Sequence, residues 1–472
     1  MNLIDTFLQT AATTPHKRAV VSGAGETVTF EQLAMQSGVL AARWKKEGIG
    51  PGDRVLVAMP VGIDLYAAIA ALWRLGAVIV FPEPAMGLAG LKHAIEMTRP
   101  EAFLAAGAYR LLRLFVPGLW AVRTHLRLAE GDRASDVLEE LRPDHPALIS
   151  FTSGSTGKPK GIVRSHGFLA AQNACVAELL TPSREDETDL VAFPVFVIAN
   201  LGQGITSVLP NWKLTRHDQA GAGTIVNLIK AQSITRALVP PSICQVLARG
   251  GADPGLSDIF TGGGPIFPDL IDALTAAAPQ TALTCVYGST EAEPISHLHA
   301  QDISAKQWMD MAEGKGLLAG APVRQTEVKI IDHEIVVTGD HVNKGYLDGA
   351  GDEENKVQIE GQIWHRTGDA GAMDSAGNLW LKGRWSAKAG EIFPFEAEVA
   401  ARSWPGVQQA ALLPGSNPPV LALEGHEPSA GAWQSRAKDL GGLRVEKVSE
   451  VPLDRRHRSK VDYARLREML DA

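Results

Sequence analysis

The segment FTSGSTGKPKG, residues 151–161, decides how the rest of the chain is interpreted. Its glycines allow neighbouring backbone N–H groups to point at one anion, its hydroxyl side chains add donors, and its two lysines add positive charge. Such a loop can hold phosphate, although a flexible polar turn is the simpler alternative. It is not a Walker A loop, because that motif needs Ser or Thr after Gly-Lys and here Lys158 is followed by Pro159.

The sequence on either side of this segment predicts its place in the fold. DHPALIS, residues 144–150, is typical of an apolar strand, and residues 161–180, GIVRSHGFLAAQNACVAELL, predict a helix. We therefore expect the loop to join a strand to a helix.

Helices and strands alternate along most of the chain. Residues 27–60 predict a capped helix, a Gly-Pro-Gly turn and a strand, and residues 62–82 predict a helix followed by the apolar strand AVIVF. Short apolar runs that end in Gly, Pro or Ser recur up to residue 290. This rhythm is typical of an α/β fold with parallel sheets, in which ligands bind at the carboxyl ends of strands.

The sequence pattern changes after about residue 327. Short β-like pieces follow, and DSAGN at 374–378 lies between two alternating runs, which predicts a hairpin. Residues 385–472 again mix helix-like and strand-like runs and have the size of a small domain. We expect a large domain at 1–384 and a small α+β domain at 385–472.

Length and composition exclude several classes of protein. A chain of 472 residues is longer than a single hydrophobic core usually supports, so we expect more than one domain. Its formal charge of −8 gives no general attraction for nucleic acid. The three cysteines are far apart without metal-ligand spacing, so we interpret them as buried apolar residues. The N-terminus has no long apolar run and the apolar region 66–82 contains Arg74, so we expect no membrane span and a cytoplasmic location.

Several motifs in one order along the chain resemble the adenylate-forming superfamily, which includes acyl-CoA synthetases, peptide-synthetase adenylation domains and luciferases. Residues 151–161 are similar to its phosphate-binding signature, YGSTE at 287–291 to its adenine and phosphate segment, and TGD at 367–369 with Gly383-Arg384 to its ribose segment. The resemblance implies a large N-terminal adenylate-forming domain with a small, mobile C-terminal lid. It implies nucleotide-binding roles for Thr152, Ser153, Gly154, Ser155, Thr156, Gly157, Lys160, Gly262, Gly263, Gly264, Tyr287, Gly288, Ser289, Asp369 and Arg384.

The resemblance also implies a reaction, in which a substrate carboxylate attacks the α-phosphorus of ATP to give an acyl-adenylate and pyrophosphate. Thr290 would contact the α-phosphate and Glu291 would hold Mg²⁺. The family's invariant catalytic lysine corresponds to Lys460, which would bridge the substrate carboxylate and the α-phosphate oxygens, in a segment that carries Ser459 where a glycine is usual. A solvated basic face is the alternative for that segment, because three arginines lie nearby.

The acyl substrate and its acceptor are less well defined. Residues 193–210 are apolar, with Phe196 where a histidine is common, so we expect a small-molecule acid of fatty type and no amino acid. We place transfer to CoA first. However, the hinge at 385–392 is short and carries Ser386 where Asp or Lys is usual, and several segments look like β-lactone synthetases, which close a β-hydroxy acyl-adenylate without CoA. A non-catalytic nucleotide-binding regulatory protein is the alternative from another class.

Overall fold

The computed structural model describes residues 1–82, 86–128, 133–153, 159–214, 220–251, 253–453 and 461–471, with only the backbone at 152 and 153. The chain divides into two compact units. The first unit comprises Met1–Asn211 and Asp340–Lys356, and the second comprises Trp212–Gly339 and Val357–Ala472. Residues 357–384 and 385–472 share one unit, so this division does not test the expected boundary at 384/385, which stays a prediction.

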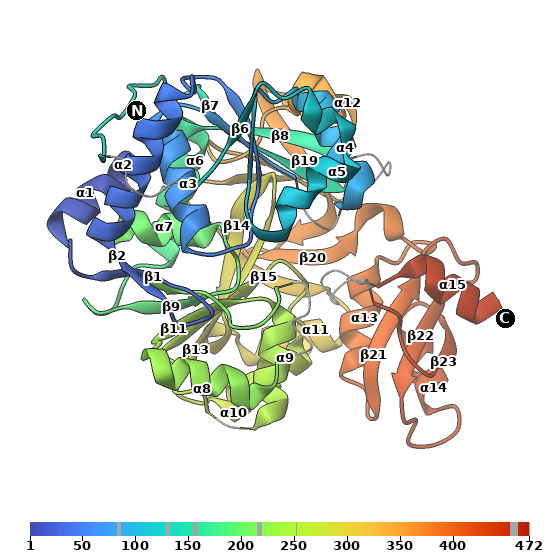
Figure 1. The fold of residues 1–472 in the computed structure, drawn as a ribbon. Helices are drawn as coiled ribbons and strands as arrows, with labels where there is room; N and C mark the ends of the chain where they lie inside the picture. Colours follow the sequence, from blue (N-terminus) through green and yellow to red (C-terminus); the bar gives the residue numbers. More distant parts are fainter. Residues whose placement is uncertain are drawn as a thin grey trace. The chain divides into compact units, whose positions relative to one another are not determined.

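The first unit contains two groups of paired strands. One sheet, of which Figure 1 labels β6, β7 and β8, has the order β6-β5-β3-β4-β7-β8, and its neighbouring strands are parallel except for the antiparallel pair β7 and β8. The other group has the order β2-β1-β10-β9. The strands are β1 Arg18–Val21, β2 Thr27–Thr29, β3 Arg54–Ala58, β4 Val78–Phe81, β5 Ala102–Ala105, β6 Thr124–Leu126, β7 Pro146–Ser153, β8 Pro159–Ser165, β9 Thr188–Val191 and β10 Thr206–Val208.

The helices of the first unit follow the expected pattern in its N-terminal part. They are α1 Asp5–Thr13, α2 Phe30–Lys46, α3 Ile63–Arg74, α4 Gly87–Thr98, η2 Gly107–Leu111, α5 Leu112–Phe115, η3 Pro117–Trp120, α6 His166–Leu179, α7 Phe196–Gln203, η6 Leu347–Gly349 and α12 Asp352–Asn355. Helix α2 begins at a capping box in which Thr29 and Gln32 satisfy each other's backbone N–H groups. The predicted helix and strand at 62–82 are confirmed as α3 and β4.

The expected strand-to-helix position of the loop is wrong. Residues 159–165 form β8, which pairs antiparallel with β7, and α6 begins only at His166. Ile162 is buried, and Ser165 caps the helix by accepting a hydrogen bond from the Phe168 N–H. The ladder with β7, the preceding strand, satisfies the backbone of residues 159–165, and this pairing outweighs the local helical pattern.

The second unit is built on a larger sheet. Its strands lie in the order β16-β17-β19-β20-β15-β14-β13-β12-β11, with β18 beside β19, and β11, β12 and β13 are parallel. They are β11 Arg236–Val239, β12 Asp258–Gly262, β13 Ala282–Ser289, β14 Ala292–His299, β15 Leu317–Pro322, β16 Glu327–Ile331, β17 Glu334–Thr338, β18 Lys356–Ile359, β19 Gln362–Met373 and β20 Leu379–Arg384. The predicted hairpin at 374–378 is confirmed, since it joins β19 to β20.

A separate three-stranded sheet follows in the same unit, in the order β21-β22-β23. Trp404, Trp433, Leu412 and Leu421 are buried in a core beside it. The remaining elements are β21 Val407–Leu413, β22 Val420–Gly425, β23 Arg444–Val448, α8 Ala222–Gln232, α9 Pro241–Gly250, α10 Pro268–Ala277, η5 Ala300–Asp302, α11 Ala305–Ala312, η7 Trp385–Ala387, α13 Pro394–Arg402, α14 Ala432–Asp439 and α15 Tyr463–Asp471.

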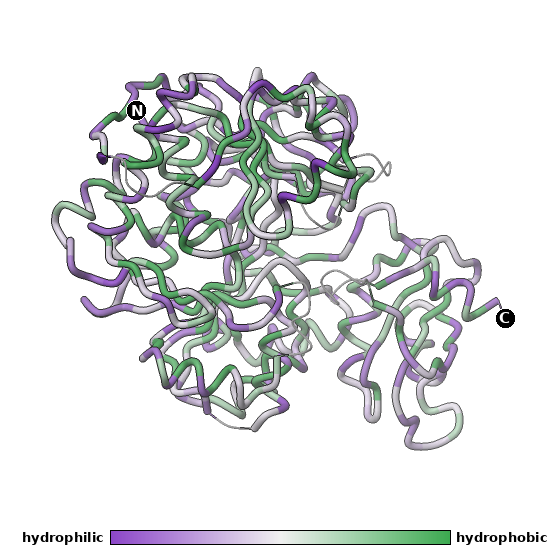
Figure 2. The backbone as a smooth tube through the Cα atoms, viewed as in Figure 1, coloured by the Kyte–Doolittle hydropathy of each residue, from purple (hydrophilic) through white to green (hydrophobic). Residues whose placement is uncertain are grey.

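The predicted fold class is confirmed as α/β, with parallel strands and a small C-terminal sheet. Hydrophobic residues are concentrated along the sheet strands (Figure 2). Within the described ranges, no helix is long and apolar enough to cross a membrane.

Candidate functional site

In the first unit, Lys160 of the 151–161 segment has a specific hydrogen-bond partner. Lys160 lies on β8 with its side chain buried, and its Nζ donates a hydrogen bond of 3.0 Å to Oε2 of Glu354 on α12. The same ammonium group lies 5.5 Å from the centroid of the Tyr346 ring. Glu354 is 57% exposed, so the pair joins a buried cation to a carboxylate that water can reach.

Gly351 allows the backbone to approach this lysine closely. Its φ of +96° lies in the left-handed region, and a Cβ placed there would lie 2.5 Å from the Lys160 Nζ. The sequence interpretation did not identify Glu354, Tyr346 or Gly351. The signal was the acidic run DEEN at 352–355, but nothing local links it to residue 160.

Part of the predicted phosphate loop lies outside the described residues. This applies to Gly154, Ser155, Thr156 and Gly157, and also to Lys460. Thr152 and Ser153 are the last residues of β7, where Thr152 pairs with Lys160 across the hairpin.

In the second unit, the glycine run lies beside the strand that carries Tyr287. Gly262 ends β12 opposite Val286 of β13, and a Cβ on it would lie 2.7 Å from the Val286 carbonyl oxygen. Gly263 has a φ of +78°, and Gly264 follows it in the segment before α10. Glycine is therefore required where the backbone passes close to β13.

Three predicted nucleotide-binding residues, from strands β13, β19 and β20, meet in this unit. The Tyr287 hydroxyl on β13 donates a hydrogen bond of 2.8 Å to Asp369 Oδ2 on β19. On β20, Arg384 Nη1 lies 3.3 Å from Asp369 Oδ1 and donates to the Thr367 carbonyl oxygen at 3.1 Å. Burial, followed by the charge of Asp369, raises the pKa of Tyr287 well above its usual value, so its hydroxyl remains a donor.

The other residues of the YGSTE motif form the end of β13 and the turn into β14. Gly288 is tightly packed, since a Cβ on it would lie 3.0 Å from the Ala292 carbonyl oxygen. The buried Ser289 hydroxyl has no hydrogen-bond partner within the part of the chain that the structure describes. Thr290 and Glu291 form the turn, so the motif offers a hydroxyl donor and a carboxylate at one end of a strand.

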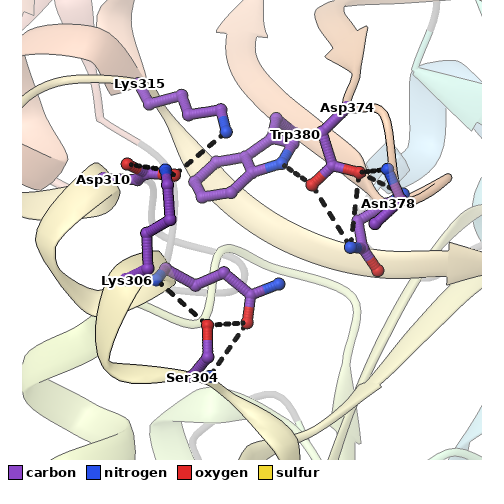
Figure 3. A network of polar contacts seen from close by, with 9 residues as sticks. Ser304, Lys306, Asp310, Lys315, Asp374, Asn378 and Trp380 are labelled. Carbon is purple, nitrogen blue, oxygen red and sulfur yellow. Dashed lines mark hydrogen bonds and ion pairs between the residues drawn. The ribbon is translucent and has the colours of Figure 1, made fainter.

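A second aspartate stabilises the hairpin next to this cluster. Asp374 accepts hydrogen bonds of 2.9 Å from the indole Nε1 of Trp380 and from the backbone N–H groups of Ala376 and Asn378 (Figure 3). Burial alone would raise its pKa, but these hydrogen bonds outweigh burial and lower the pKa to about 2. The Lys315 ammonium lies 4.0 Å from the Trp380 ring centroid. This network fixes the turn between the strands that carry Asp369 and Arg384.

His166 and the three cysteines lie in the packed interior. His166 is buried at the start of α6, accepts a hydrogen bond from the Leu3 N–H, and has a pKa lowered to about 4 by burial and then by nearby positive charge. Cys175, Cys244 and Cys285 are buried, as expected, and none of them is in a disulfide. No group of three or more metal-ligating side chains occurs among the residues that could be described.

Comparison with known proteins gives concordant results. Residues 7–347 match the family model described as AMP-binding enzyme. The chain is 26% identical to the olefin β-lactone synthetase of Stenotrophomonas maltophilia, over 97% of this chain and 94% of that protein. It is 28% identical to the 2-succinylbenzoate–CoA ligase of Bacillus licheniformis, over 86% of this chain and 85% of that protein. The solved O-succinylbenzoate coenzyme A synthetase of Bacillus subtilis, in complex with ATP and magnesium ion, has a similar fold, with a TM-score of 0.78, 22% identity, and 98% and 99% of the two chains covered.

Proposed function

We propose that this chain, which belongs to the AMP-binding enzyme family, activates a hydrophobic carboxylic acid with ATP. Its relatives identify it as an adenylate-forming ligase. A carboxylate oxygen of the acid forms a bond to the α-phosphorus, the bond to the bridging oxygen of pyrophosphate breaks, and acyl-AMP and pyrophosphate result. The observation that carries this proposal is the cluster of Tyr287, Asp369 and Arg384.

The geometry of Asp369 suits a nucleotide ribose. A carboxylate has about four acceptor positions, and here one oxygen accepts from Tyr287 while the other faces Arg384. Positions for both hydroxyls of a vicinal diol therefore remain. The tyrosine ring would pack against the purine, and the guanidinium would pair with the carboxylate.

Each unit by itself has groups that suit a phosphate. In the first unit, Lys160 and the 152–157 segment would bind phosphate oxygens, with Glu354 holding the lysine ammonium in place before they arrive. In the second unit, Ser289 and Thr290 would donate to phosphate oxygens. Glu291 is the carboxylate that fits Mg²⁺, which would neutralise phosphate charge and is commonly held in proteins by one or two carboxylates with phosphates and water.

The apolar side chains of residues 193–203 support a hydrophobic acid. Phe193 and Phe196 meet edge to face at 5.9 Å between centroids, and Val197 and Leu201 of α7 are buried. No acidic side chain occurs between 193 and 203 to pair with the ammonium group of an amino acid.

For the second step we propose closure of a β-lactone. The β-hydroxyl oxygen of the bound acyl group forms a bond to the acyl carbon, the bond from that carbon to AMP breaks, and the hydroxyl proton leaves. Two observations favour this outcome over transfer to CoA. Similarity to the olefin β-lactone synthetase spans nearly the whole of both chains, and only η7 and a short turn separate β20 from α13. Transfer to CoA is the second candidate, favoured by similarity to the CoA ligase.

The experiment is acid-dependent pyrophosphate release from ATP and Mg²⁺, with fatty acids and β-hydroxy fatty acids, with and without CoA, followed by mass spectrometry. We expect a CoA-independent product lighter than the β-hydroxy acid by one water. Acyl-CoA formed only with CoA present would replace the lactone proposal with the ligase one. Lys460→Ala should abolish pyrophosphate release, whereas the exposed Lys306→Ala should retain it. Release that survives the change at Lys460 would contradict its catalytic role.

A further inference from the structure

One segment of the first unit exposes large apolar side chains together. Leu111, Leu114, Phe115 and Trp120 are 56%, 69%, 62% and 65% exposed, and we call these four residues the 111–120 patch. Leu111, Leu114 and Phe115 are spaced i, i+3 and i+4 along the helical turns of η2 and α5, so they share one face. The indole Nε1 of Trp120 donates to the Arg113 carbonyl oxygen at 2.6 Å, which places the ring beside α5.

The exposed face is held from below by buried residues of the same segment. Val116 and Leu119 are fully buried and pack in a core with Leu91 and Ile95 of α4. η3 packs against α4, since a Cβ on Gly118 would lie 3.2 Å from Ile95 Cγ2, and Figure 1 labels α4 and α5 in this unit. The segment therefore uses separate apolar residues for its own packing, and those of the 111–120 patch contribute little to the core. Large apolar side chains gathered on a surface mark interaction sites more often than they mark packing defects.

The charge around the patch is unlike that of the whole chain. Residues 102–128 contain four arginines and no aspartate or glutamate, although the chain as a whole carries a formal charge of −8. Arg110, Arg113, Arg123 and Arg127 are all exposed. Arg123 lies 3.6 Å from Asp53, whereas no ion pair of the other three is found within the described ranges. The surface thus combines apolar side chains with three arginines, Arg110, Arg113 and Arg127, that have no ion pair within the described ranges.

We propose that the 111–120 patch and its arginines bind the surface of a membrane that contains anionic lipids. Aromatic and aliphatic side chains insert shallowly at the boundary between headgroups and acyl chains, and arginines bind the lipid phosphates around them. Trp and Arg suit this depth, because each has an apolar body and a polar end. The binding requires no spanning helix. It goes beyond the proposed reaction, and would bring the enzyme to acids that partition into lipid.

The two other occupants of such a surface are a second copy of the chain and a protein partner. A second copy would place the same arginines against each other in a symmetric contact, which like-charge repulsion disfavours. A membrane offers both an apolar layer and a continuous negative surface, so it matches the patch without a dedicated complementary face.

The experiment is co-sedimentation of the full chain with vesicles of phosphatidylcholine alone or of phosphatidylcholine mixed with phosphatidylglycerol. We expect binding to the mixed vesicles that weakens as salt is raised. Leu114→Ser with Phe115→Ser, and separately Arg110→Glu with Arg113→Glu, should each lower the partition coefficient by about tenfold.

Matched controls remove the same chemistry elsewhere. Met309→Ser deletes another exposed apolar side chain, and Arg436→Glu with Lys438→Glu makes the same change of charge on α14. Both should bind vesicles as the unmodified chain does. All these side chains are exposed, so thermal melting should stay close to that of the unmodified chain. Failure of the unmodified chain to bind mixed vesicles, or equal binding by the patch variants, would overturn the proposal. Concentration-dependent dimers lost on Leu114→Ser with Phe115→Ser would assign the patch to a second copy instead.

Discussion

Asp369 and Asp374 lie five positions apart around one end of β19, yet their surroundings differ. Asp374 accepts from a tryptophan indole and from the backbone and side chain of a tight turn, so its acceptor positions are filled by the protein. Asp369 accepts from one tyrosine hydroxyl and faces one guanidinium, and it keeps acceptor capacity. A carboxylate whose acceptor positions are filled by the protein indicates a structural role. A carboxylate that keeps acceptor positions beside an aromatic ring indicates a role in ligand binding.

The largest effect on catalysis is expected at Asp369, whose acceptor positions are only partly filled by the protein. Asp369→Asn keeps the shape but replaces one acceptor oxygen with an amide N–H₂ group, which could not accept from a ribose hydroxyl. We expect kcat/KM for ATP to fall by about a hundredfold, with thermal stability nearly unchanged. Steady-state pyrophosphate release and a thermal melt test this. A large loss of stability with normal kinetics would assign Asp369 to the structural class.

The reverse result, a loss of stability without a loss of activity, is expected at Asp374, whose acceptor positions are filled by the protein. Asp374→Asn places an amide where indole and backbone N–H donors converge, so we expect a loss of about 2 kcal/mol in unfolding free energy, with kcat/KM of the folded enzyme retained. Denaturant unfolding measures this.

The pH dependence of that difference gives a further check. The folded pKa of Asp374 is depressed from 3.8 to about 2, so the carboxylate stabilises the fold above about pH 4 and this contribution is lost as the pH falls toward 2. The two proteins should therefore converge in stability in acid. A difference that stays constant across this range would show that packing, and not ionisation, is responsible.

Some features of the fold and of the candidate site could be predicted from the sequence better than others. The capping box of α2, the DSAGN hairpin and the TGD–Arg384 pairing all depend on residues close in sequence or on consecutive strands. By contrast, the Lys160–Glu354 contact joins residues 194 positions apart, and an acidic run carries no information about such a partner. The β-strand at 159–165 pairs with the strand before it, but the helical pattern of its own residues conceals that pairing. Asp374 was recognised as part of a turn, but its indole partner is fixed only once β19 and β20 are in register.

A smaller effect is expected at the donor that orients Asp369. Tyr287→Phe keeps the ring that would pack on the purine and removes only the hydrogen bond of 2.8 Å. We expect kcat/KM for ATP to fall by about fivefold, the cost of one such bond to a charged acceptor that water can partly replace. Tyr109→Phe is the matched control in the first unit and should leave the kinetics unchanged. A loss at Tyr287→Phe as large as that of Asp369→Asn would mean that the tyrosine hydroxyl itself contacts the nucleotide.

The smallest effect is expected at a third carboxylate, which extends the comparison to a buried side chain. Glu398 on α13 is fully buried and accepts one hydrogen bond, from the Leu412 N–H at 2.9 Å. Burial raises its pKa from 4.5 to about 7, against the opposing effects of that hydrogen bond and of Arg402. The folded state therefore keeps a proton that the unfolded chain has lost, and stability falls as the pH rises from about 4.5 to about 7. Glu398→Gln removes this fall but leaves an amide N–H₂ group that needs a partner, so we expect a net gain of about 0.5 kcal/mol near pH 8 and none near pH 4. Unfolding curves at both pH values test this, and equal stability changes at both would mean that Glu398 titrates normally despite its burial.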